Sequence, residues 1–441
     1  MIKSLLIANR GEIAVRIIRT CRDLGIRAVA VFSEADRDGL HVRLADRAVC
    51  VGPPPARDSY LRRENLVSAA VICECDALHP GVGFLAENAA FARMVETAGL
   101  LWIGPSPEVI ELLGDKIRAK RTAAGLGIAG IPGAEIDPAD PDSAEREAGM
   151  LGYPVILKAA SGGGGKGMRI VRDRGELAAL LPLAAAEAEA AFGDGTVYLE
   201  KYFTDPRHVE IQLLARAGGE VLTLGERDCT VQFNHQKLIE ESPSPGITEE
   251  LRGKMVSAAA RLFREIGYSG AGTVEFLVAK GECFFMEVNA RLQVEHPVTE
   301  ARTGIDLVGQ QIIAAAEDRL NPVGEADRWI AYALECRINA AGPGTVDRLL
   351  LPGGPGVRID THLYPGAEIP PHYDPLLAKI VVSGRDRPEG IARMRRALGE
   401  MVIEGVPNNL ELQREIVGGK VFGRGEFGTA TFDALLREEK Q

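Results

Sequence analysis

A short hairpin pattern places two glutamates opposite one another, and it constrains the surrounding fold more than any other stretch. Residues 273–278 and 283–288 both have the composition of β-strands, and Gly281 lies in the turn between them. With Gly281 near the centre of the turn, Glu275 lies opposite Glu287, with the side chains about 5 Å apart. Two like charges at that spacing repel, so we expect a cation between them. A hard divalent ion such as Mg²⁺ or Mn²⁺ prefers carboxylate and carbonyl oxygens.

Polar residues continue at every second position beyond the second glutamate. A side-chain period of two places them on one face, up to Glu295, as far as the strand stays regular. The same alternation is typical of the solvent-exposed face of an antiparallel sheet, but such a face usually carries Thr, Lys and Ser in no special order. Here two metal-ligand types are followed by a bidentate cation, an amide and a carboxylate, an order that suits an anionic substrate. These residues are Glu287, Asn289, Arg291, Gln293 and Glu295.

The first 115 residues alternate between strand-like and helix-like segments. Residues 4–8 and 27–32 are apolar runs of strand length, and the helical stripe between them ends at Gly25. A second unit of this kind follows, so we predict an α/β fold with a parallel, doubly wound sheet. Residues 9–12 contain one glycine rather than the three of a dinucleotide fingerprint, which favours a structural Rossmann-like layer over a nucleotide site.

Four consecutive glycines lie between two further strand-like runs. Lys158 ends the first run, Lys166 follows the glycines, and residues 168–171 form the second run. Because glycine has no Cβ, backbone N–H groups in such a loop can wrap a polyphosphate. No Lys-Ser/Thr pair leads into a helix as in a Walker loop. The pattern therefore favours a mobile flap over phosphates, and the alternative is a passive flexible hairpin.

Composition excludes several classes of function. The chain has 441 residues, enough for two or three domains, and a net charge of −11, which argues against nucleic-acid binding but leaves room for a local basic pocket. No apolar run approaches the roughly 18 residues of a membrane helix, and the first apolar run is too short for a signal peptide. The seven scattered cysteines fit no zinc or thioredoxin motif, so we expect reduced thiols in a cytoplasmic protein.

Several long stretches resemble the ATP-grasp superfamily, and specifically the biotin carboxylase family. The resemblance extends from residue 1 to about residue 430. It implies a Rossmann-like N-terminal domain over residues 1–115, an ATP-grasp domain over 116–325 with a mobile lid at about 132–203, and a C-terminal α+β biotin-carboxylase domain over 326–441. The stretches that carry it include residues 7–14, 79–81 with 83–85, 114–116, 161–168, 200–202, 206–210, 235–237, 293–300 and 335–340.

The resemblance also implies an activity and its partners. ATP would phosphorylate bicarbonate to carboxyphosphate in the presence of Mg²⁺ or Mn²⁺, and the released CO₂ would be fixed on N1′ of biotin. The chain has no Ala/Val-Met-Lys-Met biotinylation word and no room for a carboxyltransferase. We therefore expect biotin on a separate biotin carboxyl carrier protein, with carboxyltransferase subunits as further partners. The expected system is acetyl-CoA carboxylase of fatty acid synthesis, or a related acyl-CoA or oxo-acid system, and the expected assembly is a homodimer.

The resemblance assigns roles to individual residues. Glu295 matches the base that takes the bicarbonate proton, Arg337 matches the residue that steadies the biotin enolate, and Arg291 matches the residue that binds bicarbonate. Lys237, Gln293 and the backbone of Val294 match the rest of the bicarbonate site. Glu275, Glu287 and Asn289 match the metal-binding positions. Positions that match nucleotide or biotin contacts are Lys116, Lys158, Gly164, Gly165, Glu200, Lys201, Phe203, His208, Gln232 and His235.

The sequence departs from the family pattern in three places. Phe233 and Asn234 stand where two arginines are usual, which changes the charge at the biotin approach. Val82 replaces a usual tyrosine. Residues 341–352 are shorter than the corresponding family segment and, with Pro355, lie near the usual dimer contact. Two alternatives therefore stay open: a non-catalytic paralogue that serves in binding or regulation, and an ATP-grasp ligase that joins a carboxylate to an amine without biotin.

Overall fold

The N-terminal part of the chain forms a parallel sheet, as its alternating segments predict. The computed structural model describes residues 2–159, 168–192, 195–216, 219–234, 236–320 and 330–438. In the first of these ranges five strands form one sheet, and every neighbouring pair is parallel. In spatial order the strands are β3 (Arg47–Gly52), β2 (Arg27–Ser33), β1 (Ser4–Ile7), β4 (Ala77–His79) and β5 (Leu101–Trp102).

The order of this sheet reverses between β1 and β4, and such a switch point opens a crevice at the carboxyl ends of the strands. Asn9 follows β1 and donates from Nδ2 to the carbonyls of Pro80 (2.8 Å) and Val82 (2.7 Å), which follow β4. The two loops are thereby joined at the edge of the cavity described below. The surrounding helices are α1 (Gly11–Asp23), α2 (Leu40–Leu44), α3 (Arg63–Ile72), α4 (Ala89–Thr97) and α5 (Pro107–Gly114), and the short 3₁₀ turns are Glu34–Asp36 and Ala56–Asp58.

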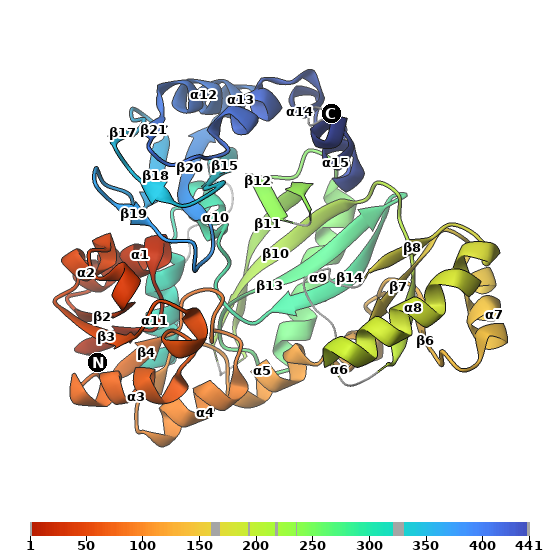
Figure 1. Cartoon of the computed structure of the whole chain (residues 1–441), viewed down its shortest axis with the longest axis horizontal. Helices are drawn as coiled ribbons and strands as arrows, with labels where there is room; N and C mark the ends of the chain where they lie inside the picture. The colour runs from red at the N-terminus through yellow and green to blue at the C-terminus, as the bar shows by residue number, and fades with distance from the viewer. Residues whose placement is uncertain are drawn as a thin grey trace.

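A long antiparallel sheet forms the centre of the molecule (Figure 1). It joins strands from residues 207–289 to strands from residues 332–384 through the pairing of β12 with β15. One sheet therefore supports both the predicted metal site and the predicted biotin-facing arginine. In spatial order its strands are β14 (Glu282–Asn289), β13 (Gly270–Ala279), β10 (Arg207–Ala215), β11 (Val221–Phe233), β12 (Gln236–Ser242), β15 (Tyr332–Asn339), β20 (Leu376–Gly384) and β18 (Val357–Thr361).

The two faces of strands β15 and β20 are chemically different. Cys336 and Ile380 belong to an apolar core together with Met394 of α12, so this face packs against α12. Because side chains alternate along a strand, Arg337 and Lys379 point to the opposite face, where α10 contacts both strands. Apart from two helices of the small sheet described next, the other helices of the described ranges are α6 (Lys116–Gly125), α9 (Glu249–Glu265), α10 (His296–Thr303), α11 (Leu307–Glu317), α12 (Arg387–Glu400), α13 (Leu410–Gly418), α14 (Lys420–Arg424) and α15 (Thr429–Glu438).

A small four-stranded sheet stands beside the central sheet, at the right of Figure 1, and has an apolar core of its own. Its strands are β6 (Gly133–Ile136), β9 (Val197–Lys201), β7 (Val155–Ala159) and β8 (Arg169–Val171), and its helices are α7 (Pro141–Leu151) and α8 (Arg174–Phe192). Strands β7 and β8 pair antiparallel on either side of the glycine-rich loop. The loop itself, residues 160–167, lies outside the described residues.

Two short strand pairs complete the C-terminal part, β16 (Gly344–Thr345) with β19 (Glu368–Ile369) and β17 (Arg348–Leu350) with β21 (Val402–Glu404). The predicted α/β class is confirmed. None of the helices in the described ranges has the length and apolar character that crossing a bilayer requires.

Candidate active site

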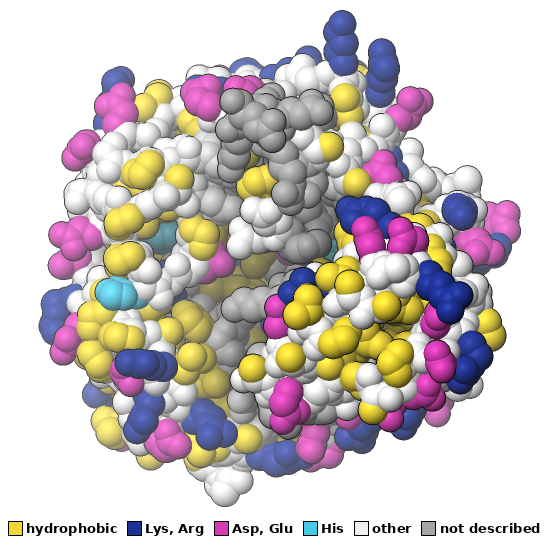
Figure 2. Space-filling model, turned by 45° about the vertical axis from the view of Figure 1, so that its right-hand side comes forward, with side chains coloured by type: hydrophobic (Ala, Val, Ile, Leu, Met, Phe, Trp, Pro, Cys, Tyr) yellow, Lys and Arg dark blue, Asp and Glu magenta, His cyan; other side chains and the backbone are white. Residues whose placement is uncertain are grey.

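A cavity of about 990 Å³ opens where the N-terminal loops, the small sheet and the central sheet meet. In the view of Figure 2 the surface is hollowed between the small sheet and the rest of the molecule. Most of the predicted site residues line this cavity: Lys116, Lys158, Glu200, His208, Gln232, Lys237, Glu275, Glu287, Asn289, Arg291, Gln293, Val294, Glu295 and Arg337. The structure thus brings together residues that are far apart in the sequence.

The predicted hairpin is present, and Glu275 lies opposite Glu287 in its register. The turn is Lys280–Gly281, where both residues have positive φ (53° and 79°), as a two-residue type I′ turn requires. Next to this turn the strand register differs by one residue from the predicted register. A bulge between Glu275 and Phe276 restores the predicted register at Glu275. The two glutamates therefore face one another because the bulge compensates for the tighter turn.

The predicted continuous strand from Glu287 to Glu295 is wrong beyond Asn289, where β14 ends. The backbone N–H of Ala290 donates to the Glu87 carboxylate (3.0 Å) instead of to a neighbouring strand. Arg291 Nε pairs with the other oxygen of Glu87 at 2.7 Å. These two contacts with Glu87 accompany the change from strand to a loop that leads to α10. The polar side chains after Asn289 nevertheless reach the same cavity.

The carboxylate pair has two different environments. Glu275 is buried and accepts hydrogen bonds from Lys237 Nζ (3.0 Å) and Asn289 Nδ2 (2.8 Å), and its other oxygen lies 2.8 Å from His208 Nε2. Burial opposes its ionisation, but Lys237 and His208 outweigh burial and hold the pKa of Glu275 well below its usual range. Partial burial and the neighbouring Glu275 raise the pKa of Glu287. A cation between the two carboxylates would relieve this repulsion.

The donor set fits a hard divalent ion on the Glu287 side of the pair. Glu210 and Glu275 also lie close enough to His208 to form a metal-ligand group, but Lys237 Nζ already contacts both carboxylates, at 2.9 and 3.0 Å. The lysine is thus the cation inside that group. Glu287 is 42% exposed, and its nearest cation in the described structure is Lys116 at 3.8 Å. Glu287 offers carboxylate oxygens of the kind that such an ion prefers, and Glu275 and Asn289 add oxygens that already contact Lys237, His208 and Arg291.

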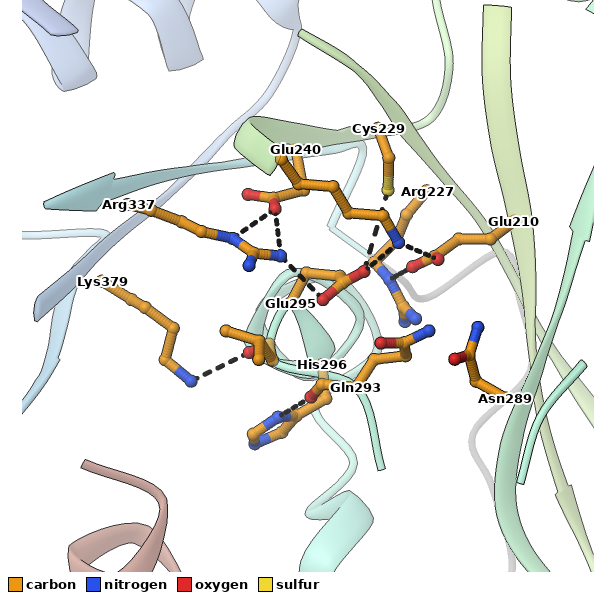
Figure 3. Close-up of polar contacts among 12 residues, drawn as sticks. Glu210, Arg227, Cys229, Glu240, Asn289, Gln293, Glu295, His296, Arg337 and Lys379 are labelled. Carbon is orange, nitrogen blue, oxygen red and sulfur yellow. Dashed lines mark hydrogen bonds and ion pairs between the residues drawn. The ribbon is translucent and has the colours of Figure 1, made fainter. Parts of the chain in front are cut away.

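Glu295 is the centre of the buried charge network in Figure 3. Its side chain is 1% exposed, and its two oxygens contact Lys237 Nζ at 2.6 Å and Arg337 Nη2 at 2.9 Å. Burial alone would raise the pKa of this carboxyl, but Lys237 and Arg337 outweigh burial and hold the pKa well below its ordinary value. Glu295 is therefore ionised at neutral pH. It directly precedes α10.

Arg337 is itself held by a second carboxylate. Its Nε donates to Glu240 at 2.6 Å, and Glu240 is fully buried. Burial raises the pKa of Glu240 to about 7, even though Arg337 lowers it. Burial lowers the pKa of Arg337, but Glu240 and Glu295 outweigh burial and raise it, so the guanidinium stays charged. A fixed guanidinium of this kind suits an anionic oxygen that develops in front of it.

The guanidinium of Arg291 connects side chains of the loop after β14 to one another and to Glu87. Besides its pairing with Glu87, Nη1 donates to Gln293 Oε1 (3.0 Å) and Nη2 donates to Asn289 Oδ1 (3.1 Å). The amides of Asn289 and Gln293 therefore present their oxygens to the arginine. Both amides donate through nitrogen to Glu275, at 2.8 and 3.2 Å. The order of polar types predicted for an anion site is thus preserved in a loop.

The other end of the cavity carries more exposed lysines. Lys116 is 48% exposed, and Lys158 is 33% exposed and pairs with the buried Glu200. Lys120, one helical turn after Lys116, pairs with the same carboxylate. Burial opposes ionisation of Glu200, but the two lysines hold its pKa below the usual value. This end can therefore offer positive charge to a phosphate chain.

Several predicted positions lie elsewhere. Lys201 Nζ donates to the carbonyl of Gly152 (2.6 Å), and Phe203 stacks on Phe284 with ring centres 4.9 Å apart, so neither side chain lines the cavity. Gln232, by contrast, lines the cavity, where its Nε2 donates to the Cys229 carbonyl (2.7 Å) and lies 2.8 Å from His208 Nδ1. Three predicted positions, Gly164, Gly165 and His235, lie outside the described residues.

The positions that depart from the family pattern also have a structural setting. Phe233 packs against the C-terminal apolar core. Asn234 has a positive φ of 49°, a conformation that asparagine tolerates better than most residues. Val82 lines the cavity, and its carbonyl accepts the hydrogen bond from Asn9. In the shortened segment, β17 pairs with β21, and Leu350 and Leu351 are exposed.

Sequence reasoning missed several charged residues in and around the site, among them Lys120, which pairs with Glu200. Glu210 had a usable signal, because it follows His208 by two residues and shares its face of β10. Glu240 had no such signal, because it follows Lys237 by three residues on β12, and a period of two places such residues on opposite faces. A shift in the pairing of β11 with β12 between Lys237 and Ile239 breaks that period. Glu87 had no local signal, because it meets Arg291 from 204 residues away. Arg227 is fully buried and contacts Glu210 at 2.6 Å, Gln212 at 2.7 Å and Thr299 at 2.8 Å, partners that no sequence pattern indicates.

Comparison with protein families gives matches along nearly the whole chain. Residues 1–110 match the biotin carboxylase N-terminal domain. Residues 115–323 match the ATP-binding domain of the carbamoyl-phosphate synthase L chain, and residues 335–434 match the biotin carboxylase C-terminal domain.

Curated relatives match nearly the whole length of the chain. Biotin carboxylase of Pseudomonas aeruginosa is 48% identical over 96% of both chains, and that of Allochromatium vinosum is 49% identical over 96% of both. A pyruvate carboxylase subunit of Methanothermobacter thermautotrophicus is 46% identical over 99% of this chain and 91% of its own.

Solved structures agree with these matches. The biotin carboxylase domain dimer of Hydrogenobacter thermophilus 2-oxoglutarate carboxylase, a complex with MgADP, ADP and bicarbonate, has a TM-score of 0.93 and 43% identity, and covers 99% of this chain and 98% of its own. A complex of biotin carboxylase from Campylobacter jejuni with β-γ-ATP has a TM-score of 0.92 and 40% identity, over 99% of both chains.

Proposed function

Because the chain belongs to the biotin carboxylase family of ATP-dependent ligases, we propose that it carboxylates biotin with ATP and bicarbonate by way of carboxyphosphate. The observation that carries this proposal is the position of Glu295. It lies between Lys237 and Arg337 in one cavity with a carboxylate pair suited to a metal ion. Bicarbonate is a poor nucleophile, so positioning and charge neutralisation dominate its activation.

Arg291, Lys237, Gln293 and the backbone of Val294 bind bicarbonate in this proposal. The planar guanidinium can hold the anion with two parallel N–H groups, which a lysine ammonium cannot do. Glu295 accepts the bicarbonate proton. Since Lys237 and Arg337 keep Glu295 ionised, its effectiveness as a base comes from its position rather than from a high pKa.

Arg337 acts in the second half of the reaction. The ureido nitrogen of biotin is very weakly acidic, so the enolate oxygen that develops on deprotonation needs a cation close by. Glu240 holds the guanidinium at 2.6 Å, which supports a fixed direction of approach. Lys237 remains on the other oxygen of Glu295 and keeps that carboxylate in place.

Glu275, Glu287 and Asn289 would hold a divalent cation, which supplies positive charge to the phosphate oxygens when bound. Lys116 and Lys158 contact the phosphates from the open end of the cavity, with the glycine-rich residues 161–167 as the covering loop. Glu200, Lys201 and Phe203 contribute the strand next to adenine, and His208, Gln232 and His235 complete the nucleotide and biotin contacts.

The proposal includes the organisation of the chain and its partners. The domains are residues 1–115, 116–325 with a lid at about 132–203, and 326–441. Biotin arrives on a separate carrier protein, a carboxyltransferase uses the product in the cytoplasm, and the chain forms a homodimer. We favour the acetyl-CoA carboxylase reaction, although the relatives include parts of pyruvate and 2-oxoglutarate carboxylases. Isolation of the chain from its own cells, with identification of the biotinylated partner, tests this assignment.

The activity itself is tested by ATP hydrolysis measured with and without bicarbonate, and then with free biotin. We expect hydrolysis that depends on bicarbonate and is stimulated by biotin. ATP cleavage that ignores both compounds would point to a ligase without biotin. No turnover at saturating biotin would favour a non-catalytic binding protein.

A further inference from the structure

Lys379 is a fully buried lysine that the sequence analysis did not single out. It lies on β20 opposite Arg337 of β15, on the face of the central sheet that meets α10. Its Nζ donates to the backbone carbonyl of Val294 at 2.9 Å and lies 3.0 Å from Glu12 Oε2. Figure 3 draws this side chain as it reaches the backbone beside Glu295. One ammonium therefore joins β20, the start of α1 and the loop that carries the predicted base.

The loop needs such a donor because it has left the sheet. Beyond Asn289 its carbonyls have no strand ladder to accept hydrogen bonds from. The Gln293 carbonyl is held locally by His296, through the backbone N–H at 3.3 Å and Nδ1 at 2.7 Å. The Glu295 carbonyl is held locally by the Val298 N–H at 3.1 Å. The Val294 carbonyl, between them, is held by a side chain that is 85 residues away in the sequence.

The ammonium is charged where it lies. Burial lowers the pKa of Lys379, but Glu12, Glu335 and Asp360 outweigh burial and raise it. Asp360 has its own partner, because Arg358 donates to it at 2.7 and 2.8 Å. Burial raises the pKa of Glu335 well above its usual value, which favours the neutral acid. Burial also raises the pKa of Glu12, although Lys379 lowers it, and Glu12 is the nearest carboxylate to Lys379, at 3.0 Å.

A buried ion pair of this kind is weak support for stability, because removing two charges from water offsets most of their attraction. A well-packed apolar pair of similar volume would often serve the fold as well. What an apolar residue cannot supply is an N–H donor to the Val294 carbonyl. The hydrogen bond to the loop therefore distinguishes a functional lysine from a lysine that only neutralises Glu12.

We propose that Lys379 is a positioning residue for bicarbonate activation, an inference that rests on the function proposed above. Its hydrogen bond to the Val294 carbonyl fixes the backbone of the loop. Gln293 and Glu295 flank this peptide and face the cavity, so the bond sets where the predicted anion contacts and the predicted base stand. Lys379 contacts no substrate in this role and acts through the loop.

Three variants separate positioning from stability: Lys379→Met, Glu12→Gln, and the double variant Glu12→Gln/Lys379→Met. Lys379→Met removes the donor and leaves Glu12 as an unpaired buried acid, so its Tm should fall most. The double variant removes both charges and should recover much of the lost Tm. Glu12→Gln keeps the hydrogen bond to Val294 and serves as the matched control.

The measurements are the KM values for bicarbonate and for ATP in bicarbonate-dependent ATP hydrolysis by the full chain. We expect Lys379→Met and the double variant to raise the bicarbonate KM about tenfold or more, since small misplacements of reacting groups cost up to about 10²-fold. The ATP KM should stay within about twofold, and Glu12→Gln should keep a bicarbonate KM close to that of the wild type. If Lys379→Met fails to fold, the double variant carries the comparison.

A double variant with recovered Tm and a wild-type bicarbonate KM would overturn the positioning role. An equal rise in the KM values for ATP and bicarbonate would also overturn it, because the effect would then be general. Failure of the proposed function is a separate result. It would appear in the wild-type chain as ATP hydrolysis that does not depend on bicarbonate.

Discussion

The two ends of the cavity hold their charges in different ways. At the inner end Glu295, Lys237 and Arg337 are 1%, 14% and 15% exposed, and their contacts are 2.6 to 2.9 Å long. At the outer end Lys116 and Glu287 are 48% and 42% exposed and stand 3.8 Å apart. The inner charges already contact one another in the lining of the cavity. The outer charges are spread along an open rim that suits a larger, flexible phosphate chain.

The difference follows from the supporting elements. The inner groups project from neighbouring strands of the central sheet and from the start of α10, where they have little freedom to move. The outer lysines come from a helix and from the small sheet. Breaking a buried ion pair typically costs about 3–5 kcal/mol, whereas an exposed pair contributes about 0–1 kcal/mol. Changes at the inner end should therefore have the larger effects.

The largest effect is expected from Glu295→Gln. The amide has nearly the same shape but cannot accept the bicarbonate proton, so bicarbonate-dependent ATP hydrolysis should fall by about 10²–10⁴-fold. ATP binding, measured by calorimetry, should persist because the outer end is unchanged. Glu241→Gln is a matched control, since Glu241 is a buried carboxylate that pairs with Arg387 at 2.7 Å outside the cavity. Normal turnover of Glu295→Gln would remove this residue from the role of base.

Arg337→Ala should separate the two half-reactions. Removal of one oxyanion-stabilising group typically lowers a rate by about 10²–10³-fold, and this loss should fall on biotin carboxylation. ATP cleavage should fall less, because Lys237 still contacts Glu295 at 2.6 Å. The measurement compares carboxybiotin formation with phosphate release in the same preparation. Equal losses in both rates would contradict this division of labour.

Glu240→Gln should change how stability depends on pH. Glu240 has a pKa of about 7 in the folded chain, above the value of about 4.3 for an unperturbed glutamate. Protonated Glu240 therefore stabilises the folded wild type at low pH, and this stabilisation is lost as pH rises from about 4.5 through 7. Glutamine mimics the protonated form at every pH. The free energy of unfolding of the variant, relative to the wild type, should improve by up to about 3 kcal/mol over that range.

Urea unfolding at pH 5, 6, 7 and 8 checks this prediction. Glu404→Gln changes a strand glutamate that is 56% exposed, and it serves as the control in which the difference from the wild type stays flat. A constant difference between Glu240→Gln and the wild type across this range would show that Glu240 is already ionised at pH 5.

The smallest effect on stability is expected at the outer end, from Lys158→Ala. Glu200 keeps Lys120 as a partner, so the free energy of unfolding should change by about 1 kcal/mol or less. The KM for ATP should rise about tenfold, in line with the loss of one charge-assisted contact. The bicarbonate KM should stay close to the wild-type value. A larger rise in the bicarbonate KM than in the ATP KM would contradict the assignment of separate roles to the two ends of the cavity.

Local patterns in the sequence determined the parallel N-terminal sheet and the pairing of Glu275 with Glu287. Hydrophobic periodicity and turn residues act over a few positions, so both can be recognised without the rest of the chain. The stretches that resemble the biotin carboxylase family predicted that the charged residues of the cavity belong to one site. They did not indicate that β14 ends at Asn289, because that end depends on the Glu87 carboxylate.

Only the tertiary structure decided which charges meet. Lys379 reaches Val294, Arg291 meets Glu87, and Arg337 lies between Glu240 and Glu295. These partners are 85, 204, 97 and 42 residues apart in the chain. A sequence period describes which face a side chain occupies on its own element, whereas an ion pair depends on how elements pack in space. Local order was therefore readable from the sequence, and the buried charge network was not.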